Sequence, residues 1–215
     1  MTLHESLPRE TSIGVSHATT PNGLRAISDP SCSAAIWQRQ PLKRFQDWID
    51  ALPPAALPRA RLMLRADAVQ RAMTDLANAH DLPGCDERAM LIDDIAALAA
   101  MFSSVMDCPY LRLRLDVIET NACRKFHIDA VTARLICTYR GRATQYGNSA
   151  AGDDPSVIHQ VPTGCPMILR GTLWPSGLTP GLLHRSPPIE GTGETRLVLV
   201  LDPIHDIETA EQHIH

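Results

Sequence analysis

Aromatic residues are scarce in this sequence, which has three Phe, three Trp and three Tyr among 215 residues. Proteins that recognise unpaired bases stack them on aromatic side chains, and domains that bind nucleic acids are usually basic. This chain instead carries a formal net charge of −4. Both features disfavour a nucleic acid as its partner.

The sequence also lacks segments that would direct it into or across a membrane. Its first residues show no basic region followed by an apolar run, and no stretch approaches the roughly 18 consecutive apolar residues of a membrane span. None of its six cysteines forms a C-x-x-C pair. We therefore expect a cytoplasmic protein without a membrane partner, which needs neither a disulfide nor a zinc ribbon to fold.

Apolar residues make up 44% of the chain, enough for one core domain with a helical lobe. Residues 1–35 are rich in Ser, Thr, Pro and Gly, and we expect them to form a loosely ordered leader. Apolar residues then recur at helical spacing, which predicts helices at residues 41–52, 58–80 and 86–106. Residues 36–109 are therefore expected to form a helical lobe packed on the rest of the chain.

After Tyr110 the hydrophobic pattern changes to a period of two. Alternating or β-branched runs predict strands at residues 111–119, 131–140, 166–171 and 195–202. Helices followed by strands are typical of the α+β class. Roughly seven or eight short strands within residues 110–215 suit a double-stranded β-helix, the jelly-roll core also used by cupins.

A candidate metal site is formed by His127-Ile128-Asp129 and by His184, which follows His127 after 57 positions. On an extended chain, side chains two positions apart leave the same face, so His127 and Asp129 could bind one ion together. The third ligand must come from another strand. Two imidazoles and one carboxylate bind one face of a ferrous ion and leave the opposite face open for reaction.

The segment around this motif is basic. Residues 110–150 contain seven basic and three acidic side chains, a local charge of +4, whereas residues 190–215 contain six acidic residues and Arg196 as their only base. Arg196 lies 12 positions after His184, in the strand-like run TRLVLVL at residues 195–201. The basic segment indicates either ordinary surface charge or a cationic entrance that attracts a small carboxylate.

Over roughly residues 110–202 the ligand pattern, the late arginine and the strand order resemble those of the iron(II)/2-oxoglutarate-dependent dioxygenases. A closer resemblance, to the bacterial family called domain of unknown function 1826, rests on specific blocks of sequence. These blocks are HID at residues 127–129, RLICTYRG at 134–141, TQY at 144–146 and HRSPP at 184–188. Because that family has no established activity, the resemblance names no substrate.

The resemblance to the dioxygenases implies a role for each residue of the site. His127, Asp129 and His184 would bind Fe(II), and 2-oxoglutarate would chelate the same ion. Arg196 would hold the distal carboxylate of 2-oxoglutarate in a bidentate pair, and Tyr139 would donate a second hydrogen bond to it. The substrate to be hydroxylated would be a small molecule or a peptide.

Other interpretations stay open. The same three ligands would bind zinc well, because Irving–Williams preferences do not favour ferrous iron. The chain would then be a non-catalytic or regulatory metal-binding protein on the same barrel. A domain with a degenerate site would serve only as a structural or partner-binding module. Arg134 and Arg170 are the alternatives to Arg196 as the partner of the cosubstrate carboxylate, and no motif indicates an oligomeric state.

Overall fold

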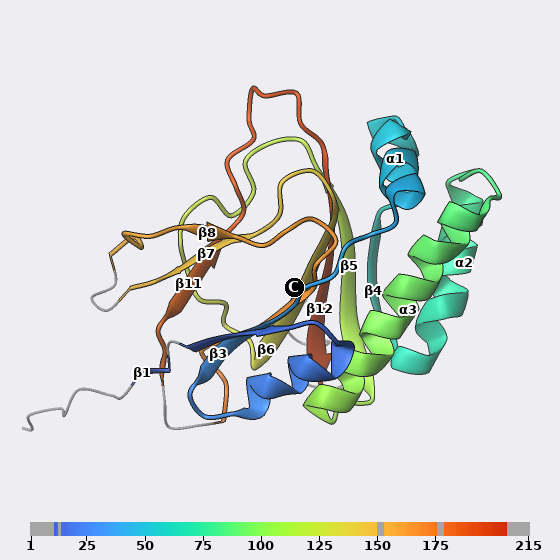
Figure 1. The fold of residues 1–215 in the computed structure, drawn as a ribbon. Helices are drawn as coiled ribbons and strands as arrows, with labels where there is room; N and C mark the ends of the chain where they lie inside the picture. The colour runs from blue at the N-terminus through green and yellow to red at the C-terminus, as the bar shows by residue number, and fades with distance from the viewer. Residues whose placement is uncertain (1–10, 13, 150–152, 176–178, 206–215) are drawn as a thin grey trace, which may run out of the picture.

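The computed structural model describes residues 11–12, 14–149, 153–175 and 179–205. Its largest element is a seven-stranded sheet in the order β2-β3-β9-β6-β12-β5-β4 (Figure 1). The strands are β2 (Gly14–Ala18), β3 (Cys32–Trp37), β4 (Ala60–Arg65), β5 (Tyr110–Ile118), β6 (Ala133–Arg140), β9 (Met167–Arg170) and β12 (Arg196–Ile204). Neighbouring strands are antiparallel except β2 and β3, which run parallel.

Smaller sheets complete the strand arrangement of the described residues. β11 (Leu182–Arg185), β7 (Gln145–Asn148) and β8 (His159–Gln160) form a three-stranded antiparallel sheet. β1 (Thr11–Ser12) pairs with β10 (Thr179–Pro180). Figure 1 shows the three-stranded sheet on one side of the large sheet and the α-helices on the other, so the large sheet is the middle layer.

The helices are α1 (Lys43–Ala51), α2 (Val69–Ala79) and α3 (Asp86–Met106), with short 3-10 segments at Pro21–Ser28, Pro54–Ala56 and Ala66–Ala68. α3 coincides with the helix predicted at residues 86–106. α1 lies within the helix predicted at 41–52. It ends before Leu52, whose extended backbone (ψ 135°) is the conformation that a following proline imposes.

The helix predicted at residues 58–80 is wrong in its first half, because residues 60–65 form β4. This strand pairs with β5 along its whole length, with Leu62 opposite Leu113. The sequence ARLMLR places Leu62 and Leu64 on the face that packs against the helices, whereas Arg61 is exposed. An alternating run joined directly to a helix can be mistaken for one longer helix, since period two and period 3.6 overlap over a few residues.

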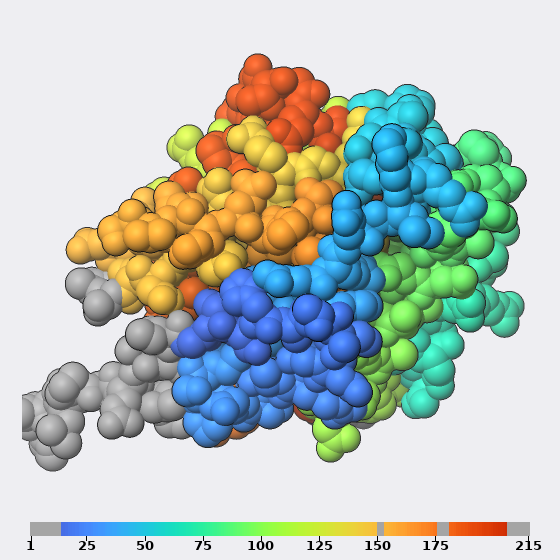
Figure 2. All heavy atoms as spheres, viewed as in Figure 1, coloured from blue at the N-terminus to red at the C-terminus, as the bar shows by residue number. Residues whose placement is uncertain are grey.

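The N-terminal segment is not the loose leader that we expected. Its described residues contribute β2 and β3 to the large sheet, and Leu24 and Ile27 between these strands are fully buried. β3 is buried on both faces, so its run of small and apolar residues shows no alternation that would signal a strand. Figure 2 shows this blue segment continuous with the green helix and the orange residues, in one body. Residues 1–10 lie outside the described residues.

The expected division at residues 35 and 109 therefore does not match the structure. β2 and β3 come from the expected leader, β4 from the expected helical lobe, and β5, β6, β9 and β12 from the expected barrel. All of them belong to one hydrogen-bonded sheet. The three segments thus contribute strands to one continuous sheet, with α1, α2 and α3 packed on it.

Two hydrophobic cores lie on the two faces of the large sheet. The larger core joins the sheet to the helices and includes Leu197, Leu199 and Leu201 of β12. The smaller core lies between the large sheet and the three-stranded sheet and includes Val198 and Val200 of the same strand. Alternation along β12 thus sends Arg196 and these two valines to the face away from the helices.

Among the described helices, α3 is the one that is long and apolar enough to cross a membrane. Seven of its residues are buried in the larger core. Asp94, in its middle, pairs with Arg39 at 2.5 Å. These contacts are those of a core helix packed on a sheet. All six cysteines are free thiols.

Candidate metal and cosubstrate site

The segment His127-Ile128-Asp129 lies beside β11, with His127 directly opposite His184. The two residues exchange backbone hydrogen bonds, each of 3.0 Å from N–H to carbonyl oxygen. Their imidazole rings are 4.6 Å apart between centroids. Asp129, two positions further along, brings its carboxylate to the same place. One ligand atom from each of the three residues lies within 4.8 Å of the other two.

The side-chain geometry of this triad fits a divalent cation. Asp129 Oδ2 lies 3.0 Å from His184 Nε2, and Asp129 Oδ1 lies 3.4 Å from His127 Nε2. Oδ2 is buried and receives no hydrogen bond of good geometry. His127 Nδ1 lies 2.8 Å from the carbonyl oxygen of Lys125, so Nδ1 carries the proton and Nε2 keeps its lone pair. Two imidazole nitrogens and an orphaned carboxylate oxygen therefore converge on one point.

The protonation states of Asp129 and His184 also suit a metal. Burial alone would raise the pKa of Asp129, but the adjacent imidazoles of His127 and His184 and the charge of Arg134 hold it well below its usual value. The adjacent Asp129 carboxylate raises the pKa of His127, whereas burial lowers the pKa of His184. At neutral pH Asp129 is thus ionised and His184 is neutral, which are the forms that bind a cation.

Arg134 of β6 holds the carboxylate ligand in place. Its Nη1 lies 2.6 Å from Asp129 Oδ1, while its Nε and Nη2 donate to the two carboxylate oxygens of Asp202 at 2.6 and 2.9 Å. Asp202, on β12, is 4% exposed. Arg134 is therefore a positioning residue whose donors are already committed, so it does not serve as the alternative to Arg196. Asp202 was not among the residues predicted for the site.

Arg170, the other alternative, is committed as well. It is 3% exposed and donates to the backbone carbonyls of Ile27, Asp29 and Pro30. Its guanidinium also lies over the ring of Trp174, 4.4 Å from the centroid. This side chain ties the N-terminal segment to β9 and takes no part in the site.

Gly171, immediately after β9, allows the backbone of the ligand segment to pass close by. A Cβ atom at this position would lie 1.9 Å from the carbonyl oxygen of Val131 and 2.7 Å from that of Asp129. The amide of the next residue, Thr172, donates to the same Asp129 oxygen at 2.9 Å. Glycine is thus required here because backbone atoms, which cannot rotate away, occupy the space of a side chain.

Gly171→Ala should therefore displace Asp129 and weaken metal binding by about tenfold or more, the loss typical of disturbed support around a ligand. Metal titration of the purified variant would measure it. Gly84→Ala is the matched control, since a Cβ at Gly84 meets no atom within 4 Å. Equal metal affinity in both variants would contradict this account of Gly171.

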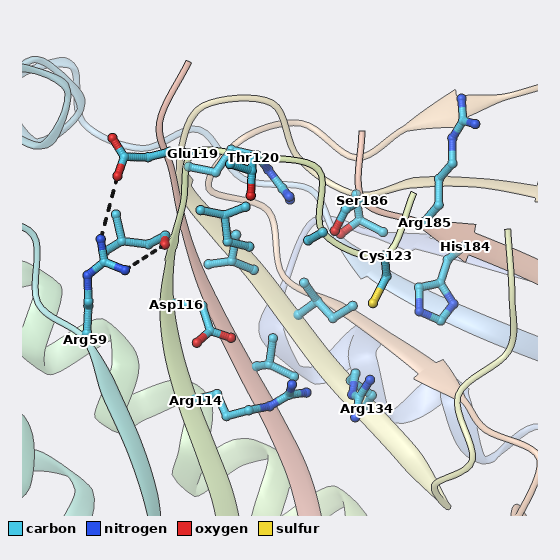
Figure 3. Close-up of a pocket in the computed structure, with 18 of the residues that line it drawn as sticks. Arg59, Arg114, Asp116, Glu119, Thr120, Cys123, Arg134, His184, Arg185 and Ser186 are labelled. Atoms are coloured by element: carbon cyan, nitrogen blue, oxygen red, sulfur yellow. Dashed lines mark hydrogen bonds and ion pairs between the residues drawn. The ribbon is translucent and has the colours of Figure 1, made fainter. Parts of the chain in front are cut away.

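The triad opens onto a cavity of about 460 Å³ on the face of the large sheet that the helices do not cover. Figure 3 shows His184 and Cys123 on one side of this cavity and Arg59 with Glu119 on the other. Its basic lining consists of Arg59, Arg61, Arg114, Arg134, Arg185 and Arg196, and its acidic lining of Asp116 and Glu119. The cavity is therefore suited to anions.

Arg196 is the most deeply buried charged residue of this cavity, at 1% exposure. Its Nε donates to the carbonyl oxygen of Arg142 at 2.6 Å, but its Nη1 is buried without a hydrogen-bond partner. No carboxylate in the described part of the chain forms an ion pair with it. Burial lowers the pKa of Arg196 to about 10, against an opposing effect of Glu194, so it stays cationic at neutral pH.

Tyr139 does not reach the cavity, and its predicted role in binding the cosubstrate is wrong. It lies five positions after Arg134 on β6, so the two side chains leave opposite faces of the sheet. The Tyr139 hydroxyl donates to Asp94 Oδ2 at 2.7 Å, and its ring meets Phe45 edge-on among the helices. Counting positions along the strand from Arg134 would have excluded it.

Tyr139→Phe should lower the free energy of unfolding by about 1.5–3 kcal/mol, the usual contribution of a hydrogen bond to a charged group. Asp94 Oδ2 keeps its hydrogen bond from Arg39 at 2.7 Å, which limits the damage. Binding of 2-oxoglutarate should be unchanged. Chemical denaturation and cosubstrate titration would check both results, and a folded variant with impaired cosubstrate binding would restore the original role of Tyr139.

A family described as "protein of unknown function (DUF1826)" matches residues 18–202. The chain belongs to this family. The match includes β3 and β4 as well as the site. No functionally curated protein matches the chain.

Two solved structures share the fold. The dioxygenase for auxin oxidation 1 from Arabidopsis thaliana, in its binary complex with 2-oxoglutarate, is 10% identical, with 91% of this chain and 94% of that chain covered and a TM-score of 0.56. The dioxygenase for auxin oxidation from rice is 12% identical, with 91% and 84% covered and a TM-score of 0.54. At this identity the similarity shows the fold, a mixed α and β structure of the 2-oxoglutarate oxygenase type.

Proposed function

We propose that this protein is an iron(II)/2-oxoglutarate-dependent dioxygenase that hydroxylates a small substrate. His127, Asp129 and His184 would hold the iron, and Arg196 would hold the distal carboxylate of 2-oxoglutarate. The shared fold of a dioxygenase that binds 2-oxoglutarate supports the proposal. The donor set supports it too, because two imidazoles and one carboxylate leave open positions on the metal.

The observation that carries the proposal is the state of Arg196. A buried hydrogen-bond donor without a partner costs about 1–3 kcal/mol, and more when the group is charged. Arg196 Nη1 is such a donor, in the same cavity as His127 and His184. A dicarboxylate that binds the metal at one end and Arg196 at the other would remove this penalty.

Each residue of the site has a task in such a reaction. When bound, iron with 2-oxoglutarate and dioxygen supplies the oxidising chemistry that places a hydroxyl group on a substrate carbon. His127, oriented by the Lys125 carbonyl, and Asp129, oriented by Arg134, hold the donor atoms in fixed directions. His184, which is 5% exposed, and Val198 and Val200, which line the same cavity, would limit the access of bulk water to the metal.

The competing function is non-catalytic zinc binding by the same triad. Zinc needs only the three ligands and a water molecule, and nothing in that task requires a buried cation in the same cavity. The guanidinium of Arg196, whose Nη1 has no partner among the described residues, therefore favours the dioxygenase over the zinc protein.

Anaerobic titration with Fe(II), with and without 2-oxoglutarate, separates the two functions. The proposal expects a weak visible charge-transfer band that appears only when both are present. Zinc should suppress the band by competing for the triad. Stable zinc binding with no such band at any 2-oxoglutarate concentration would favour the metal-binding protein.

A further inference from the structure

Arg114 is a second cationic group in the cavity, separate from Arg196. It lies on β5, on the face turned away from the helices, directly opposite Arg61 of β4 and Val200 of β12. Arg196 lies four residues from Val200 on β12. At a rise of about 3.3 Å per residue, the two cationic positions are roughly 13 Å apart along the sheet. Two cationic positions this far apart along the sheet leave room for two separate anionic groups in the cavity.

The charge of Arg114 is poorly compensated within the protein. Its nearest carboxylate oxygen, Asp202 Oδ2, is 3.8 Å from Nη2 and already accepts a hydrogen bond from Arg134 at 2.9 Å. Arg61 has its own partner, Asp116, at 3.0 Å. The Nε of Arg114 is buried and has no hydrogen-bond partner. Figure 3 shows the Arg114 side chain extending across the sheet toward Arg134.

This arrangement is unfavourable unless an anion joins it. Arg61 and Arg114 are like charges directly opposite one another on paired strands, which destabilises a sheet. Burial and the charge of Arg134 both lower the pKa of Arg114, against an opposing effect of Asp202. A small anion at Arg114 would satisfy the buried Nε and offset the repulsion from the neighbouring guanidinium groups.

The floor of the cavity between Arg114 and the metal ligands is apolar. Val200 neighbours Arg114 across the strands, and Ile136 of β6 neighbours Val200 on its other side. Both residues line the cavity with Val198. A ligand held at Arg114 would therefore lay a hydrocarbon portion over these side chains, in the direction of His127 and His184.

We propose that the substrate is a small organic anion, a carboxylate or a phosphate ester, whose charged group pairs with Arg114 and whose hydrocarbon portion lies over Ile136, Val198 and Val200. This inference rests on the proposed function, since it assigns Arg196 to 2-oxoglutarate and leaves Arg114 for the substrate. It places the carbon to be oxidised on the hydrocarbon portion, away from the anionic group.

Calorimetric titration of the anaerobic protein, loaded with Fe(II) and saturating 2-oxoglutarate, tests the pairing. The probes are hexanoate and hexyl phosphate, with hexanamide as the uncharged analogue. Wild-type protein should bind at least one anion about tenfold or more tightly than the amide, as expected for a charge-assisted hydrogen bond. Arg114→Gln should abolish this preference, and Arg114→Lys should recover part of it.

Arg112→Gln is the matched control, because Arg112 is on the same strand and the same face but does not line the cavity. It should keep the preference for the anion. Equal binding of hexanoate, hexyl phosphate and hexanamide to wild-type protein would overturn the inference, as would an anion preference that survives in Arg114→Gln.

The charge-transfer band separates this inference from the proposed function. If wild-type protein never forms the band with Fe(II) and 2-oxoglutarate, the dioxygenase proposal fails, whatever the anion titration shows. If wild type forms it and Arg114→Gln loses it, Arg114 serves 2-oxoglutarate and the substrate assignment is overturned. Retention of the band in Arg114→Gln, with loss of the anion preference, supports the inference.

Discussion

Replacing His184 by Ala should remove the bound metal almost completely. His184 is 5% exposed and provides one of three donor groups that meet within 4.8 Å. With two donors left, affinity should fall by more than the roughly 10- to 100-fold that loss of a supporting residue around a ligand usually costs. Elemental analysis after dialysis should therefore change from about one divalent metal per chain to nearly none.

Two further variants make this prediction specific. His127→Ala should behave like His184→Ala, because each removes one imidazole from the same ion. His80→Ala is the matched control, since His80 caps the C-terminus of α2 and belongs to no cluster of metal ligands among the described residues. Denaturation curves of the metal-free proteins would show that the variants still fold. Wild-type metal content in both His127→Ala and His184→Ala would refute the site.

The meeting of the three ligands could be predicted from sequence because most of it is local. The spacing of His127 and Asp129 alone puts their side chains on one face. The third ligand, His184, had only to lie on another strand, which is β11. The strands β5, β6, β9 and β12 were predictable for the same reason, since an alternating or β-branched run is a property of neighbouring residues.

What could not be predicted depends on pairing between distant segments. Arg134 and Asp202 are 68 positions apart, and their ion pair follows from the way β6 and β12 align in the large sheet. The N-terminal strands were missed because β3 is covered on both faces and its partner β9 is more than a hundred residues away. The predicted role of Tyr139 was wrong for a simpler reason. Side chains alternate between the two faces of β6, and this alternation puts Tyr139 on the face away from the cavity.

Arg196→Ala should leave metal binding nearly intact while weakening 2-oxoglutarate binding by roughly 30-fold or more. Removal of one partner of a buried charged pair costs about 2–5 kcal/mol of binding free energy, and the lower end of this range corresponds to that factor. The guanidinium is 1% exposed, and its free Nη1 has no partner in the described part of the chain. Among the described residues, no hydrogen bond or ion pair joins Arg196 to the triad, so the metal should be unaffected.

Arg196→Lys distinguishes a bidentate pair from a simple requirement for positive charge. Lysine keeps the charge but cannot present the planar fork that matches a carboxylate, so it should recover only part of the lost affinity. Arg142 is the matched control, because it lies near Arg196 but pairs with Glu194 at 2.7 Å instead of facing the cavity. Titration of each protein with 2-oxoglutarate, followed by the charge-transfer band, would rank the variants. If Arg196→Ala binds 2-oxoglutarate as tightly as wild type, the buried guanidinium serves another anion and the cosubstrate must be held elsewhere in the cavity.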